Sequence, residues 1–207
     1  MSLIEGIKIR DIAVLSWVKN NGDKTHSIDH DLNSESLVID FGGYTGEWAE
    51  KIVSKYGCSI EIYEPFSRFV QQIENRFQDN LERVKIFQFA VSNKDTSAAL
   101  FEDDLATRIV ENNSGEIRVV DASSRISGRK IDLLKMNIEG SEYEVFDSLF
   151  QSNEIKNIKS LLVQFHPIDD DSISRYNSIF EKLSETHECV FRYPFIWEKW
   201  TIRGHSS

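Results

Sequence analysis

The chain has 207 residues, a length that fits one domain with one hydrophobic core. Its 24 basic and 34 acidic residues give a net charge of −10 without any dense run of Lys and Arg. Nucleic-acid binders usually carry a basic face, so we expect no nucleic-acid partner. No apolar stretch is long enough to cross a bilayer, and charged residues interrupt the N-terminal apolar runs. We therefore expect a cytoplasmic protein without a signal peptide or membrane span.

The residue types that commonly bind metals are few and scattered. Cys58 and Cys189 lack the spacing of a metal or redox motif, and their apolar surroundings indicate two core residues. His26 and His30 lie in a polar stretch, where a metal site and two solvated loop histidines are the alternatives. We favour solvated histidines, so the sequence predicts no metal.

Residues 1–36 are predicted to form an extension that packs on the main domain, residues 37–207. Apolar residues among the first 20 positions mostly follow helical spacing, although Ile7 and Ile9 alternate as in a strand. We favour a helix there, followed by a polar connection to Ser36.

From Leu37 onward, short apolar runs alternate with stretches in which apolar residues recur at helical spacing. The periodic stretches predict helices, the first capped by Thr45, over residues 45–56, 66–77, 141–150 and about 176–183. The apolar runs predict strands over residues 37–41, 58–63, 84–91, 116–120, 131–138 and 158–165, and a final hairpin of 189–193 and 196–202. This alternation predicts an α/β fold with a mostly parallel sheet covered by helices on both faces.

The segment Val38-Ile39-Asp40-Phe41-Gly42-Gly43-Tyr44-Thr45-Gly46 reads as a buried strand followed by a glycine-rich turn. Such a turn at the carboxyl end of a parallel strand lets a ligand approach the backbone. Phe41 stands where the dinucleotide-binding fingerprint requires its first glycine, so that fingerprint fails. Asp40 can orient the turn or, through water, attract a cationic group of a bound cofactor. The alternative is a plain tight turn.

Glu64 ends the next predicted strand. A carboxylate at this place can accept hydrogen bonds from both hydroxyls of a ribose. An exposed acid at a strand end is the alternative in a chain this acidic. Because the glycine-rich turn and Glu64 belong to one strand–helix–strand unit, together they favour nucleoside binding.

A third motif, from Asp132 to Glu142, reads D-L-L-K-M-N-I-E-G-S-E. A buried strand would carry Asn137 and Glu139 to its carboxyl end, and Gly140 would permit a sharp turn into a helix. With this segment the chain resembles the FkbM family of S-adenosylmethionine-dependent methyltransferases, whose strand reads approximately D-L-[IL]-K-[IM]-D-[VI]-E-G-[AS]-E. The glycine-rich turn and the segments Glu64-Pro65 and Ala90-Val91-Ser92 also match. The resemblance spans about residues 37–167.

The resemblance implies a Rossmann-like class I methyltransferase, with a mostly parallel seven-stranded sheet, helices on both faces and a C-terminal antiparallel hairpin. It implies O-methylation of a sugar or natural-product-like small molecule, with a nucleotide-linked sugar among the candidate acceptors. The residues expected to bind S-adenosylmethionine are Asp40, Gly42, Gly43, Gly46, Glu64, Ala90, Val91 and Asn137, with Ala90 and Val91 against the adenine.

Asn137 departs from the family, which commonly has Asp at this position. An amide cannot act as a base, so we predict that Glu139, helped by His166 after the next strand, removes the proton of the acceptor. Asn137 would then only position the acceptor or the amino group of the cofactor. Glu142 is expected to stabilise the start of the following helix.

Two other functions compete with this prediction. The first is a catalytically silent module that binds the cofactor or another adenosine compound and acts as a regulatory or scaffold subunit. Asn137, which cannot ionise, is the feature that supports this hypothesis. A nucleotide-dependent oxidoreductase is weakened by Phe41 in the glycine-rich turn. The sequence carries no prediction of the oligomeric state.

Two groups of side chains have weaker functional interpretations. Trp197 and Trp200 in the final hairpin could flank an acceptor sugar, but packing is favoured. Arg125, Arg129 and Lys130 could hold a phosphate of the acceptor, but a solvated loop is favoured.

Overall fold

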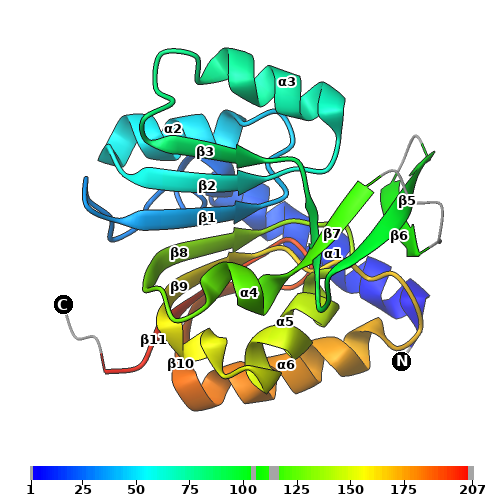
Figure 1. The fold of residues 1–207 in the computed structure, drawn as a ribbon. Helices are drawn as coiled ribbons and strands as arrows, with labels where there is room; N and C mark the ends of the chain where they lie inside the picture. The colour runs from blue at the N-terminus through cyan, green and yellow to red at the C-terminus, as the bar shows by residue number, and fades with distance from the viewer. Residues whose placement is uncertain (1, 104–105, 112–116, 205–207) are drawn as a thin grey trace.

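A seven-stranded sheet forms the centre of the molecule, in the strand order β10-β11-β9-β8-β1-β2-β3 (Figure 1). The computed structural model describes residues 2–103, 106–111 and 117–204, and only the backbone within 99–111. Strands β3, β2, β1, β8 and β9 run parallel, and the β10–β11 hairpin is antiparallel. The strands are β1 (Leu37–Phe41), β2 (Ser59–Tyr63), β3 (Val84–Phe87), β8 (Ile131–Met136), β9 (Ile158–Val163), β10 (His187–Tyr193) and β11 (Trp197–Ile202). The predicted fold class and terminal hairpin are confirmed.

Helices cover both faces of this sheet because successive strand residues point to opposite sides. Val38 and Leu133 pack toward α2 (Glu47–Tyr56) and α3 (Ser67–Arg76). Ile39 and Leu134 pack toward α5 (Glu142–Gln151) and α6 (Ser172–Thr186) on the other face. Each Ile or Leu side chain buried in this way stabilises the fold by about 1.5–3 kcal/mol. The shorter helices are η1 (Gly22–Lys24), α4 (Ala122–Ile126) and η2 (Glu154–Asn157).

The predicted N-terminal helix is confirmed as α1 (Leu3–Lys19). It lies against β10 and α6, with Gly6, Ala13 and Trp17 buried. Gly6 fits closely under the loop after β9, because a Cβ there would lie 2.9 Å from the Cβ of Pro167. The helix therefore approaches the edge of the sheet at which β9 ends.

The prediction of two solvated loop histidines is wrong. The ring of His26 stacks on Phe191 with centroids 4.8 Å apart, and His30 Nε2 lies 3.1 Å from the carbonyl oxygen of Ser27. Burial lowers the pKa of His30 to about 4. The ring of His26 helps to attach the N-terminal segment to the domain, whereas the ring of His30 binds within that segment.

The single strand predicted over residues 84–91 is also wrong. Strand β3 ends at Phe87, because its partner β2 ends at the paired residue Tyr63. The amide of Phe89 then donates to the carbonyl oxygen of Phe87 (2.9 Å), and this tight turn redirects the chain.

The redirected chain enters a second, four-stranded sheet in the order β4-β7-β5-β6. Its strands are β4 (Ala90–Ser92), β5 (Thr96–Asp103), β6 (Ala106–Glu111) and β7 (Ile117–Asp121). The hairpin of β5 and β6 was not predicted, whereas β7 confirms the strand expected near 116–120, of which residue 116 lies outside the described residues. In Figure 1 the second sheet stands at the side toward which the arrows of β1, β2 and β3 point.

Candidate active site

Apart from Ala90 and Val91, the predicted site residues lie at the edge where β1, β2, β8 and β9 end, since the carboxyl ends of parallel strands meet at one edge. The glycine-rich turn follows β1, and Glu64 follows β2. Asn137 follows β8, and its amide donates to the carbonyl oxygen of Phe41 (3.0 Å). The turn and the third motif are therefore in direct contact.

The glycines of the turn are required by the fold itself. Gly42 has φ +90°, and a Cβ there would lie 2.0 Å from the backbone oxygen of Asn137. A Cβ on Gly43 would lie 2.3 Å from Cγ2 of Ile62. Gly46, at φ +79°, is the N-cap of α2, so the predicted cap at Thr45 is wrong. Residues with side chains at these three positions would push the turn away from β8 and β2 or strain its backbone.

Asp40 and Lys135 form a buried ion pair beneath the turn. Lys135 Nζ donates to Asp40 Oδ1 (2.9 Å) and to the carbonyl oxygen of Gly42 (2.6 Å). Burial raises the pKa of Asp40, and the charge of Lys135 opposes that change. Asp40 Oδ2 is buried without a hydrogen-bond partner. Asp40 thus orients the turn through Lys135, a residue that the sequence analysis did not single out.

Glu64 is buried and not an exposed strand-end acid, with 4% of its surface accessible. Its Oε2 accepts from the amide of Tyr44 (2.8 Å), and its Oε1 accepts from the amide of Phe66 (3.0 Å). Burial raises its pKa to about 7 against the opposing effect of these two donors. Each oxygen of a carboxylate can accept a second hydrogen bond, so Glu64 retains capacity for a ligand with two donors.

His166 lies between two carboxylates at the ends of β8 and β9. Its Nδ1–H donates to Glu142 Oε1 (2.9 Å), and its Nε2 lies 3.6 Å from Glu139 Oε2. Glu142 has no accessible surface and also accepts from the amides of Ile138 (2.8 Å) and Gly140 (2.9 Å). Glu142 therefore lies at the start of the helix, as expected. Its carboxylate binds the backbone of the preceding turn and the imidazole of His166.

The two carboxylates raise the pKa of His166. Burial alone would lower it, and the charge of Arg10 on α1 acts in the same direction. The hydrogen bond and charge of Glu142, together with the charge of Glu139, outweigh both effects. The imidazole therefore binds a proton more readily than a free histidine does.

Asn137 and Glu139 have different environments although they are close in sequence. Asn137 is partly buried, and its Oδ1 is buried without a hydrogen-bond partner. Glu139 is exposed, with a left-handed φ of +55°. Such a conformation is uncommon outside glycine and is typical of backbone held in place at functional sites.

Ala90 and Val91 lie beyond the turn at Phe89, in the second sheet. Both are buried, and Ala90 pairs with Val119 of β7. The carbonyl of Phe87, at the end of β3, accepts from the amide of Glu64 (3.1 Å). The end of β3 therefore lies beside Glu64, and Ala90 and Val91 come after the change of direction.

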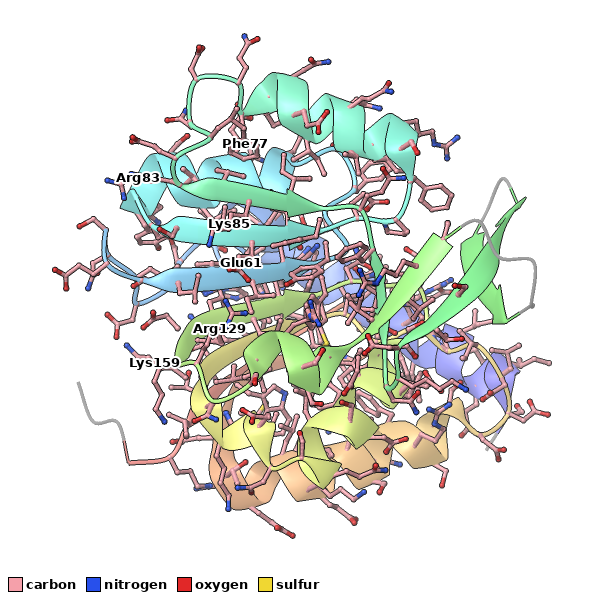
Figure 2. All side chains as sticks on the ribbon, viewed as in Figure 1. Glu61, Phe77, Arg83, Lys85, Arg129 and Lys159 are labelled. Carbon is pink, nitrogen blue, oxygen red and sulfur yellow. The ribbon has the colours of Figure 1, made fainter. Side chains whose placement is uncertain are left out.

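Several of the remaining candidates take part in packing or in ion pairs. Arg129 is not a solvated loop cation, since its guanidinium binds Glu61 through two hydrogen bonds of 2.9 and 3.1 Å (Figure 2). Trp200 is fully buried, in agreement with the predicted packing role. Cys58 is buried as expected, but Cys189 is only partly so.

Two further findings concern the described ranges, 2–103, 106–111 and 117–204. Within them, no group of three or more His, Cys, Asp and Glu residues could hold a metal ion. Within the same ranges, no helix has the length and hydropathy needed to span a bilayer.

Comparison with solved structures finds methyltransferases of the same fold. A methyltransferase FkbM from Methylobacillus flagellatus KT matches at 15% identity and a TM-score of 0.56, over 82% of this chain and 44% of that chain. An rRNA methylase from Streptococcus thermophilus matches at 7% identity and 0.51, over 83% and 89%. A fibrillarin–Nop5p complex matches at 12% identity and 0.51, over 83% and 74%. This chain thus spans less than half of the first of these proteins, and at such identities the likeness concerns the fold alone.

Comparison of the amino-acid sequence with known families is more specific than comparison of the fold. No curated protein matches the chain. The family model described as the methyltransferase FkbM domain matches residues 40–193, from Asp40 in the glycine-rich motif into the final hairpin. This match covers most of the chain, and the chain therefore belongs to the FkbM methyltransferase family.

Proposed function

We propose that the protein transfers the methyl group of S-adenosylmethionine to a hydroxyl group of a small molecule. The observation that carries this proposal is the group formed by Glu139, His166 and Glu142, which lies at the same strand edge as the glycine-rich turn. A hydroxyl acceptor must lose its proton, and a histidine held between carboxylates is suited to take it.

The acceptor atoms at this edge fit the proposed cofactor. Asp40 Oδ2 and Asn137 Oδ1 are buried without partners, and Glu64 can accept two more hydrogen bonds. We assign Glu64 to the two ribose hydroxyls. We assign Asn137 Oδ1 and Asp40 Oδ2 to the methionine portion, beside the turn of Gly42, Gly43 and Gly46. When bound, the cofactor supplies a methyl group activated by a positively charged sulfur.

The adenine would lie at the end of β3, against Ala90 and Val91. This assignment follows the match of Ala90-Val91-Ser92 to the family pattern, and the hydrogen bond between Glu64 and Phe87 supports it by joining the ends of β2 and β3. A cofactor complex with the adenine out of van der Waals contact with both residues would contradict this placement.

His166 and the side chains around it would orient the acceptor and remove its proton. Buried Glu142 fixes the imidazole by accepting from Nδ1–H, so that the neutral ring presents the lone pair of Nε2 toward Glu139. Glu139 would take the hydroxyl proton, and the neutral imidazole would help by accepting it from Glu139 at Nε2. Asn137 cannot ionise, so it would position the acceptor or the amino group of the cofactor.

We propose a sugar or natural-product-like alcohol as the acceptor, with a nucleotide-linked sugar as one candidate. The family resemblance supports this class. The net charge of −10 argues against a bare polyanion such as RNA, although one of the structural relatives is named an rRNA methylase.

The proposal is tested by incubating the protein with methyl-labelled S-adenosylmethionine and a panel of sugars, nucleotide sugars and phenols. We expect label in a base-stable ether, and Glu139→Gln or His166→Ala should lower turnover by roughly 10²–10⁴. Glu154→Gln, a carboxylate in η2, serves as the matched control.

If no methyl transfer is detected, calorimetry with the cofactor distinguishes the possible reasons. Binding without transfer to any acceptor would support the silent module. Absence of binding would refute the cofactor assignment. Full activity in both variants would mean that solvent takes the proton.

A further inference from the structure

The outward face of α1 is unusually apolar for a surface helix. The structure describes eight exposed large hydrophobic side chains, and five of them lie on this one helix: Ile4, Ile12, Val14, Leu15 and Val18. Ile12 and Leu15 are 70% and 71% exposed. Gly6, Ala13 and Trp17 attach the opposite side of the helix to the domain. Exposed apolar residues that gather on one helix in this way commonly mark an interaction surface.

The exposed residues form a regular seam along the helix. Ile4, Lys8, Asp11, Leu15 and Val18 follow one another at spacings of four, three, four and three residues, and all five are exposed. This is the spacing by which one helix meets another in a coiled coil. Ile12 and Val14 flank the seam and widen its apolar area.

The two charges within the seam select the orientation of a partner helix. If a second copy of α1 packs antiparallel, with Ile4 opposite Leu15, then Lys8 of each copy lies opposite Asp11 of the other. A parallel pair would instead place Lys8 against Lys8 and Asp11 against Asp11, which costs free energy. The order apolar, basic, acidic, apolar is thus complementary to itself under a twofold axis.

We infer that α1 is the interface of a symmetric homodimer, in which the seam packs antiparallel against the same seam of a second copy of this chain. The length of α1 limits the strength of this dimer. A helix of 17 residues is about 26 Å long, and a single helix pair buries less than the roughly 1,600 Å² of a standard interface. Association is therefore reversible and depends on protein concentration.

Sedimentation equilibrium of the full chain between about 1 µM and 1 mM tests the inference. The wild-type protein is expected to pass from monomer to dimer over this range. Lys8→Asp and Asp11→Lys each create two like-charge contacts per dimer and should weaken association about tenfold or more. Lys24→Asp, the same charge change on exposed η1 outside the seam, should leave association unchanged.

Charge exchange tests whether Lys8 and Asp11 face each other across the interface. The single variants make the test specific for the antiparallel arrangement, because in a parallel pair each would only replace one like-charge contact by another. An equimolar mixture of Lys8→Asp and Asp11→Lys should dimerise as the wild type does, because both contacts are again complementary. The double variant Lys8→Asp/Asp11→Lys should do the same with itself. Circular dichroism and thermal unfolding confirm that each variant is folded, since these side chains are exposed.

Three results would overturn the inference. The first is a wild-type protein that is monomeric throughout the concentration range. The second is dimerisation that neither charge variant weakens, and the third is a mixture that fails to restore it. A monomer that co-sediments with vesicles of phosphatidylcholine and phosphatidylserine would assign the seam to a membrane surface instead.

Discussion

The buried carboxylate of Glu64 predicts how cofactor affinity depends on pH. Its pKa in the ligand-free site is about 7 compared with an ordinary value of 4.5, so ionising it there costs about 3 kcal/mol more than in water. For an acid with a raised pKa in the folded state, the free energy of unfolding falls as pH rises from 4.5 to about 7. A ligand that donates two hydrogen bonds to the ionised form recovers part of that free energy.

Cofactor affinity should therefore rise with pH up to about 7 and then level off. Binding should release protons near pH 6, where the ligand-free carboxyl is mostly protonated. Glu64→Gln should weaken binding by about 1.5–3 kcal/mol, which is roughly 10- to 150-fold in Kd, because hydrogen bonds to a charged acceptor are lost. The same variant should lose this pH dependence.

Isothermal titration calorimetry near pH 6 and pH 8, in two buffers of different ionisation enthalpy, measures both quantities. Glu61→Gln is the matched control, because Glu61 is a buried carboxylate in β2, the strand that Glu64 follows, and it binds Arg129 instead (Figure 2). We expect its cofactor affinity to equal that of the wild type. If folded Glu64→Gln also binds with wild-type affinity and wild-type pH dependence, Glu64 does not contact the cofactor.

Three further predictions concern the rest of the site. The kcat/KM of the wild type should rise with pH through an apparent pKa above 6.5, and Glu139→Gln should move that limb to lower pH, because it removes a charge that stabilises protonated His166. Asn137→Asp should preserve or raise turnover at saturating cofactor, since it restores the usual residue of the family; a large loss would mean that the amide itself is required. Gly42→Ala should lower the free energy of unfolding in urea by about 2 kcal/mol or more, because its Cβ would meet the backbone of Asn137 at a left-handed φ.

The sequence was sufficient to predict elements with their own hydrophobic period. Leu37–Phe41 appears as predicted, and Ile131–Met136 lies within the strand predicted over residues 131–138, because both are apolar runs that bury both faces of a parallel strand. The break at Phe87 could not be read in this way. Residues 84–91 form one largely apolar, strand-like stretch, and what ends the pairing is the length of β2, set by a different segment.

The sequence predicted the position of the glycine-rich turn correctly, but it explained only part of why glycines are needed there. We expected the glycines to admit a ligand to the backbone, and Gly42 and Gly43 are already needed for contact with Asn137 and Ile62. The first of these contacts joins segments almost a hundred residues apart. The local sequence shows that a small residue stands at this position, but it does not show which distant atom would clash with a larger one.

Asp40 is a second case in which a distant residue decides the role of a side chain. The sequence allowed its charge to act on a cationic cofactor, yet Lys135 already opposes that charge at 2.9 Å. What Asp40 retains for a ligand is one buried oxygen without a partner, and Asn137 offers another. An amide oxygen can fill that role as well as a carboxylate can, because hydrogen-bond acceptance there does not require a net charge. On the proposed function, the exchange of Asp for Asn at position 137 would preserve cofactor binding, and any catalytic cost would fall on proton removal, which we assign to Glu139 and His166.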